Sequence, residues 1–213
     1  MTVSSVIVAA GQGKRFGGKK QFEKINDKIV LDYSVEVLRK FSSEIIIVTD
    51  KNDNDFIRKR YNDVRIAFGG KERMDSVFNG LSKIRECDIV IIHDAARPCI
   101  EARYVKELID SAKLFKAAIL AYPATDTLKQ VKDNFITNSI DRTIIYAAQT
   151  PQAFNYKMLL KAYSKALKND KIYTDESSVW EEFYGKVKIV KGDGKNIKIT
   201  TKDDLEIVKC LLG

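Results

Sequence analysis

Short apolar runs alternate with stretches of helical periodicity along the chain. The apolar runs predict strands at residues 4–9, 44–49, 64–67, 89–93, 117–122 and 187–191. The periodic stretches predict helices at residues 31–40, 53–60, 75–84, 102–115, 156–167, 176–184 and 201–212. Thr201, followed by Asp203 and Asp204, resembles an N-cap with acidic residues in the first helical turn.

Two of these strands, 45–48 and 89–92, are apolar at consecutive positions. Such a pattern is typical of strands buried on both faces of a parallel sheet. We therefore expect a doubly wound, Rossmann-like α/β fold with a mostly parallel sheet, formed by one domain over residues 1–213. Ligands of such folds bind beyond the carboxyl ends of the strands, so the residues after each strand are the candidates for function.

The segment 125–146 interrupts this alternation. Residues 128–132 and 135–137 flank Asp133-Asn134, which predicts a β-hairpin, and a second short strand is expected at 143–147. An exposed hairpin leaves unpaired strand edges. The segment is either a surface excursion that caps the sheet or a dimerisation arm.

The loop after the first strand combines small residues with four cations. Small side chains at Ala9, Ala10 and Gly11 would let a nucleobase approach the backbone closely. The backbone amides of the loop would then face a triphosphate, while Arg15 and Lys20 supply positive charge. The alternative is a tight strand-to-helix turn with solvated lysines.

Two better-known phosphate loops fit this segment poorly. A dinucleotide fingerprint fails because Phe16 occupies the third glycine position. A P-loop nearly matches through Gly13, Gly18 and Lys19, but Lys20 replaces the hydroxyl residue that would bind magnesium.

His93-Asp94-Ala95-Ala96-Arg97-Pro98 follows the fourth predicted strand. Asp94 would face the ligand crevice, where a carboxylate can hold a magnesium ion or a substrate hydroxyl; a helix-capping role is the alternative. Arg97 could pair with Asp94 or with a phosphate. His93, the single histidine, is interpreted as a structural residue.

Other strand ends carry weaker signals. Gly70 and Ser76 belong to a glycine turn that opens a helix, where an anion or a base edge could bind. The segment 149–154 precedes a predicted helix. The segment 174–177 has the pattern of a helix cap followed by acidic residues. A glycine turn over 191–196 leads into an expected short strand that carries Lys198. For the turn of Gly70 and Ser76 an ordinary glycine turn with an N-cap is the equal alternative, and the other three segments are interpreted first as structural.

Composition narrows the function further. The net charge of +8 is scattered rather than blocked, which argues against a dedicated nucleic-acid partner. Cys87, Cys99 and Cys210 are far apart and form no metal-ligand spacing, as expected of reduced thiols in the cytoplasm. We expect neither a signal peptide nor a membrane span.

Seven stretches in order resemble one family over nearly the whole chain. They are Ala9-Ala10-Gly11-x-Gly13-x-Arg15, Lys20-Gln21, Gly69-Gly70-x-x-Arg73-x-x-Ser76, His93-Asp94-Ala95-Ala96-Arg97-Pro98, Thr150-Pro151-Gln152, Thr174-Asp175-Glu176 and Asn196-Ile197-Lys198. The sequence resembles the 2-C-methyl-D-erythritol 4-phosphate cytidylyltransferases of the non-mevalonate isoprenoid pathway. The resemblance implies a nucleotidyltransferase fold of the glycosyltransferase A-like type.

The resemblance also implies a reaction. The phosphate of a polyol phosphate attacks the α-phosphorus of CTP, with magnesium on the triphosphate, and pyrophosphate leaves. Arg15 and Lys20 would stabilise the transition state, and Asp94 would lie near the alcohol substrate and the metal. The nucleotide would be bound around Ala9, Ala10, Gly11, Gly13, Gly70, Ser76 and Ala95.

The same resemblance gives the hairpin a role. Thr127 and Arg142 would reach the alcohol phosphate in the neighbouring subunit of a homodimer, and Lys198 would position that phosphate. Departures are small: Val8 stands where many members have proline or leucine, and Lys71 stands at an often acidic position near the ribose.

Three alternatives remain at this point. Ribitol-5-phosphate cytidylyltransferase shares the fold and chemistry, but Ala9-Ala10-Gly11 and Ala95-Ala96 favour the methylerythritol enzyme. A non-catalytic nucleotide-binding protein would be expected to lack Arg15, Lys20 or Asp94, and all three are present. An RNA-binding module would need aromatic side chains on an open sheet face, which the buried strands disfavour.

Overall fold

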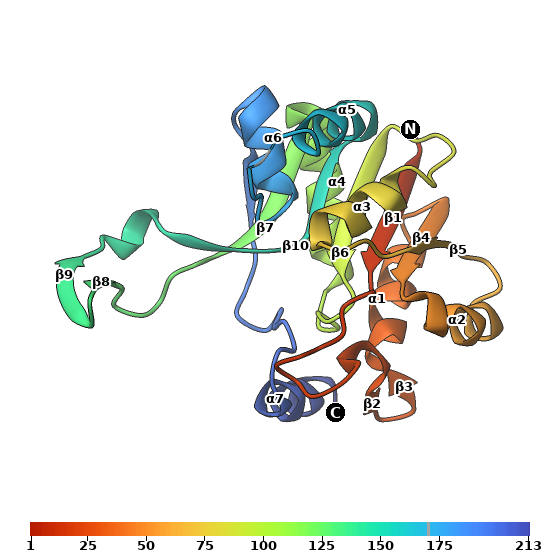
Figure 1. Ribbon diagram of the computed structural model, residues 1–213, viewed down its shortest axis with the longest axis horizontal. Helices are drawn as coiled ribbons and strands as arrows, with labels where there is room; N and C mark the ends of the chain where they lie inside the picture. Colours follow the sequence, from red (N-terminus) through yellow and green to blue (C-terminus); the bar gives the residue numbers. More distant parts are fainter. Residues whose placement is uncertain (170) are drawn as a thin grey trace.

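A seven-stranded sheet forms the centre of the molecule, in a computed structural model that describes residues 1–169 and 171–213 (Figure 1). The strand order is β11-β7-β10-β6-β1-β4-β5, and only β10 runs antiparallel to its neighbours. The strands are β1 (Val3–Val8), β4 (Glu44–Thr49), β5 (Arg65–Phe68), β6 (Ile89–Asp94), β7 (Ala117–Pro123), β10 (Tyr146–Asn155) and β11 (Lys188–Lys191). The predicted doubly wound α/β fold is confirmed.

Helices cover both faces of this sheet. One face packs against α1 (Val30–Arg39), α2 (Asn54–Arg60) and α4 (Ala102–Phe115), and the other against α3 (Arg73–Leu81), α5 (Tyr156–Ala166) and α6 (Glu176–Tyr184). Successive residues of one strand enter opposite clusters: Ile47 packs on the first face and Ile46 on the second. This two-sided burial explains why these strands are apolar at consecutive positions.

A third, smaller cluster joins the C-terminal helix α7 (Lys202–Leu212) to the first loop. Phe16 from the loop packs with Leu205 and Val208 of α7. Thr201 caps α7 as predicted, since its side chain accepts a hydrogen bond from the amide of Asp204. The helix therefore supports the loop from outside the sheet.

The predicted hairpin is present and protrudes from the body (Figure 1). Strands β8 (Lys129–Lys132) and β9 (Phe135–Ser139) form a separate two-stranded sheet. Asp133 and Asn134 adopt positive φ angles of 50° and 66° in the turn, which suits these two residue types. Both strands are exposed along their length.

The expected short strand at 143–147 is wrong. Arg142–Ile144 is a 3₁₀ helix, and β10 then runs for ten residues as a central strand. Pro151 argued against a strand here, because proline cannot donate to a ladder. The ladder with β7 is irregular between Ala148 and Gln152, so the proline lies where pairing is interrupted.

Two further differences lie near the site. The segment that carries Lys198 is irregular rather than a strand; the amide of Ile199 donates to the carbonyl of Ala96 at 2.8 Å. The sequence also did not predict the 3₁₀ helix Lys20–Phe22 or the small hairpin of β2 (Lys24–Ile25) and β3 (Lys28–Ile29). In the described parts of the chain, no helix has the length and apolar character needed to cross a bilayer.

Helix α3 lies unusually close to the sheet at Gly80. A methyl group there would approach a methyl of Val6 to 2.5 Å and one of Val48 to 2.8 Å. We expect Gly80→Ala to destabilise the fold by about 2 kcal/mol, because overpacking outweighs the gain in helix propensity. Urea unfolding measures the change.

The matched test removes the nearest clash. Val6→Ala opens space beneath position 80, so the double variant should lose less free energy of unfolding than the two single losses combined. Strict additivity would mean that Gly80 does not make this close approach.

Candidate functional site

The first loop is held in shape by its own backbone. The amides of Phe16, Gly17 and Gly18 all donate to the carbonyl of Gly13, at 2.9, 2.9 and 3.3 Å. Gly13 has a φ of 64°, and a Cβ there would lie 1.9 Å from the carbonyl oxygen of Gly18. These three amides therefore point into the loop, toward Gly13, and not toward a ligand. The expectation that loop amides face a triphosphate now applies to the residues before Phe16.

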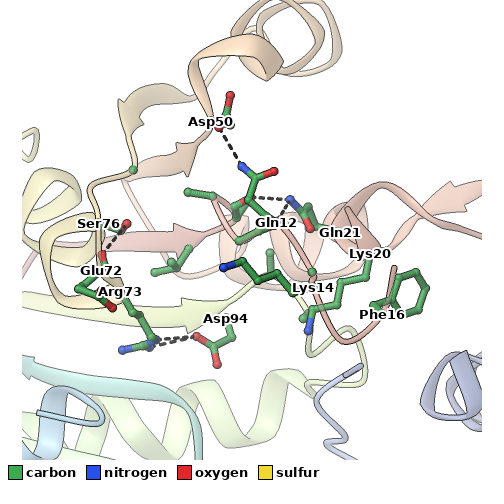
Figure 2. A pocket seen from close by; sticks show the side chains of 18 of the residues that line it. Gln12, Lys14, Phe16, Lys20, Gln21, Asp50, Glu72, Arg73, Ser76 and Asp94 are labelled. Atoms are coloured by element: carbon green, nitrogen blue, oxygen red, sulfur yellow. Dashed lines mark hydrogen bonds and ion pairs between the residues drawn. The ribbon is translucent and has the colours of Figure 1, made fainter. Parts of the chain in front are cut away.

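Gln21 fixes the start of this loop. Its buried side-chain amide donates to the carbonyls of Ala9 (2.7 Å) and Gly11 (3.1 Å) (Figure 2). Gln21 belongs to the Lys20-Gln21 motif, but the sequence pattern alone predicts no role for it. A polar residue on a short helix directly after a cationic loop was the available signal.

Lys19 and Lys20 have different surroundings. Lys19 pairs with Asp53 at 2.7 Å, which takes the lysine of the P-loop pattern away from the cavity. Lys20 lines the cavity; burial lowers its pKa, and the positive charges of Lys198 and Arg15 lower it further. Lys20, the residue that departs from the P-loop pattern, thus lies in the cavity near Arg15 and Lys198.

A cavity of about 780 Å³ lies over the carboxyl ends of β1, β4 and β6. It brings together most of the predicted site: Ala9, Ala10, Gly11, Gly13, Arg15, Lys20, Gly70, Ser76, Asp94, Ala95 and Lys198. This position agrees with the rule for ligand sites in doubly wound folds. Arg97, Thr127 and Arg142 lie outside it.

The turn before α3 forms one wall of this cavity. A Cβ on Gly69 would lie 2.5 Å from that of Ala10, so glycine allows the two loops to meet. Ser76 accepts from the amide of Gly70 (3.0 Å) and donates to the carbonyl of Glu72 (3.1 Å). In this conformation the Ser76 hydroxyl holds the turn.

Four charged groups meet where β6 ends. Asp94 accepts from Arg73 (3.0 Å) on Oδ1 (Figure 2) and from Lys198 (2.6 Å) on Oδ2. Arg73 also pairs with Glu176 at 2.5 Å. Burial alone would raise the pKa of Asp94, but Arg73 and Lys198 hold it well below its usual range. Asp94 is therefore an ionised, buried carboxylate between two cations.

His93, Arg97 and Thr150 form a hydrogen-bond network next to this carboxylate. The carbonyl of Arg97 can only accept, so Nε2 of His93 carries the hydrogen and donates to it (3.2 Å). In the neutral ring Nδ1 then accepts from the hydroxyl of Thr150 (3.1 Å), which itself accepts from the amide of Asp94 (3.0 Å). Burial lowers the pKa of His93 to about 4, which keeps the ring neutral. The structural interpretation of His93 is confirmed.

A second cavity of about 250 Å³ opens on the other side of Asp94. It contains Arg97, whose guanidinium donates to the carbonyl of Asn196 (2.7 Å) rather than to Asp94. Within the described residues, Nε of Arg97 is buried without a hydrogen-bond partner. Of the residues that the structure describes, only Arg73, Asp94 and Lys198 line both cavities.

The two arm residues lie apart from both cavities of this subunit. Thr127 and Arg142 are exposed, and the Arg142 guanidinium donates to the carbonyl of Thr125. Figure 1 shows the arm extending away from the body that holds the cavities. Thr127 and Arg142 therefore line neither cavity of the chain that carries them.

The side chains around Asp94 do not form a metal site by themselves. Over residues 1–169 and 171–213, no group of three or more His, Cys, Asp or Glu side chains could hold an ion. Both oxygens of Asp94 already contact cations. The donor set suits a metal that arrives on a polyphosphate and takes one carboxylate oxygen from the protein.

Comparisons with known proteins agree with this geometry. Curated cytidylyltransferases of 2-C-methyl-D-erythritol 4-phosphate from Clostridioides difficile and Caldanaerobacter subterraneus are each 40% identical, over 99% and 100% of this chain and 93% and 99% of their own. The crystal structure of 4-diphosphocytidyl-2C-methyl-D-erythritol synthase from Anaerococcus prevotii matches with a TM-score of 0.87 and 32% identity, covering 99% of this chain and 98% of that one.

A second solved structure supports the same assignment. The 2-C-methyl-D-erythritol 4-phosphate cytidylyltransferase of Francisella tularensis superposes with a TM-score of 0.86 at 34% identity, covering 99% of each chain. The family model for 2-C-methyl-D-erythritol 4-phosphate cytidylyltransferase matches residues 3–213. The chain therefore belongs to the 2-C-methyl-D-erythritol 4-phosphate cytidylyltransferase family.

Proposed function

We propose that the chain transfers CMP from CTP to the phosphate of 2-C-methyl-D-erythritol 4-phosphate. The products are pyrophosphate and 4-diphosphocytidyl-2-C-methyl-D-erythritol, an intermediate of non-mevalonate isoprenoid biosynthesis. The observation that carries this proposal is the wall of Arg73, Asp94 and Lys198, which two cavities share. A donor nucleotide and an acceptor phosphate would meet at that wall.

The larger cavity is the proposed CTP site. The small residues Ala9, Ala10 and Gly11 leave room for the base, and Arg15 and Lys20 lie where a triphosphate would follow. The acceptor phosphate is already an anion, so the transfer needs alignment and charge neutralisation more than a general base. An oxygen of that phosphate bonds to the α-phosphorus of CTP while pyrophosphate departs.

The smaller cavity is the proposed acceptor site. Arg97 lines this cavity and brings a positive charge to it, which suits a phosphate or a polyol hydroxyl. Magnesium on the triphosphate, with Asp94 as its one nearby carboxylate, would offset phosphate charge. Lys198, while paired with Asp94, would use another of its three N–H donors to contact the acceptor phosphate.

The enzyme works as a homodimer in this proposal. The arm exposes Val131, Phe135 and Ile136, by 58%, 76% and 66% of their surface, and such apolar surface favours a partner. Each arm would bring Thr127 and Arg142 to the acceptor cavity of the other subunit. The three cysteines are free thiols, which suits the cytoplasm where we place the enzyme.

Pyrophosphate release with two acceptors tests the substrate. With CTP and magnesium, we expect kcat/KM for methylerythritol phosphate to exceed that for ribitol phosphate by about a hundredfold or more, because the cavity must match one polyol. A preference for ribitol phosphate would favour the related enzyme, and no release with either acceptor would favour a binding protein.

Lys20→Ala should lower kcat by about a hundredfold or more, because it removes a cation expected to act on the transition state. The KM for CTP should change little. Lys24→Ala, an exposed lysine on β2, is the matched control and should keep wild-type kinetics. Wild-type turnover in the Lys20 variant would remove this residue from the mechanism.

Mixed dimers test the arm. Arg142→Ala alone should raise the KM for the acceptor. Lys20→Ala and Arg142→Ala chains are then unfolded, mixed and refolded, and assayed with acceptor well below the KM of the Arg142 variant, where both parents contribute little. A swapped arm gives each hybrid one intact site, so about a quarter of wild-type activity should return. An arm that serves its own subunit would give no recovery.

A further inference from the structure

Glu176 is a buried carboxylate at the start of α6 that the proposed reaction leaves without a role. Its exposed fraction is 0%, and it accepts hydrogen bonds from Arg73 at 2.5 and 3.2 Å. The hydroxyl of Tyr163 is a third donor, at 3.2 Å. The sequence pattern at residues 174–177 predicts a helix cap followed by acidic residues.

Arg73 links this carboxylate to the site. Its Nη1 faces Glu176, its Nε faces Asp94 at 3.3 Å, and its Nη2 lies between the two carboxylates. The planar guanidinium therefore has a fixed orientation, set by one anion on each edge. Burial lowers the pKa of Arg73, but Glu176 and Asp94 together hold it well above its ordinary value.

The geometry divides the two oxygens of Asp94 between two cations. Arg73 contacts Oδ1 only, which leaves Oδ2 to Lys198 at 2.6 Å. Without the charge of Glu176, Arg73 would be free to turn and contact both oxygens of Asp94. Lys198 would then lose its partner at the wall between the cavities.

We propose that Glu176 is a positioning residue for the transfer: it holds Arg73 so that Asp94 and Lys198 stay aligned between the two cavities. The effect passes through Arg73, because Glu176 lines neither cavity itself. This inference rests on the proposed function, since it concerns the alignment of groups for that reaction.

The chain provides a matched structural control. Asp32, 7% exposed, also accepts from an arginine and a tyrosine, Arg60 and Tyr61, but it lines neither cavity. Asp32→Asn breaks a comparable buried network, so it should lower the melting temperature and leave kcat per folded site unchanged. Tyr163→Phe removes the hydroxyl from Glu176 and keeps the ion pair with Arg73, so it should also keep kcat.

The test compares Glu176→Gln with these controls. Calorimetric titration with CTP counts the folded sites, and kcat is expressed per site. We expect Glu176→Gln to lower kcat by about tenfold or more while KM for CTP changes by less than about threefold, because small misplacements of aligned groups slow a transfer strongly. Should this variant not fold, Arg73→Lys keeps the charge but loses the planar contact to both carboxylates, and the same loss is expected.

A second background separates positioning from general destabilisation. The Asp94→Asn protein is expected to be slow, so its transfer rate is measured over hours with enzyme in excess of substrate. Adding Glu176→Gln or Arg73→Lys should lower this rate by less than about twofold further, because the Asp94 carboxylate that these residues position is gone. An equal fold-loss in both backgrounds, or a kcat like that of the wild type, would overturn the inference.

Failure of the function itself is distinguishable. A wild-type chain that releases no pyrophosphate from CTP with any polyol phosphate would overturn the proposed function and this inference with it. If the wild type is active and Glu176→Gln and Arg73→Lys are equally active, the positioning role of Glu176 is overturned and the proposed function stands.

Discussion

The ion pairs of Asp94 organise the functional edge of this molecule. The carboxylate ends a central strand and is 6% exposed, so water cannot compensate its charge. Its two partners are far apart in the sequence, Arg73 in α3 and Lys198 in the irregular segment before α7. Because a buried charge must be paired, the anion draws both elements to the end of β6. Both cavities are shaped around that junction.

The position of the site was predictable because parallel strands end on one edge of their sheet. Residues after β1, β5 and β6 had to come together once the strands were recognised as buried on both faces. The contact between Arg73 and Glu176 was not predictable, since 103 positions separate them and neither lies in a pattern that points to the other. Packing of α3 and α6 on the same face creates that pair.

The arm and β10 show a second limit of sequence reasoning. The hairpin was predictable from Asp133 and Asn134, which tolerate the positive φ angles of a tight turn. The strand after it was not, because Pro151 interrupts the pattern and the first residues of β10 are exposed. In the proposed dimer the arm residues would act on a second chain, and no pattern within one chain encodes the position of the other.

The base of the arm is closed by the sheet itself. Tyr146 pairs with Pro123, and the amide of Ala124 donates to the carbonyl of Ile145 at 2.9 Å. The chain thus leaves and re-enters the body at one point, and the strand order does not depend on the length of what lies between. The arm is an insertion in the architectural sense. Mutations within it can alter the proposed subunit pairing while the larger cavity keeps its own shape, so the two properties can evolve separately.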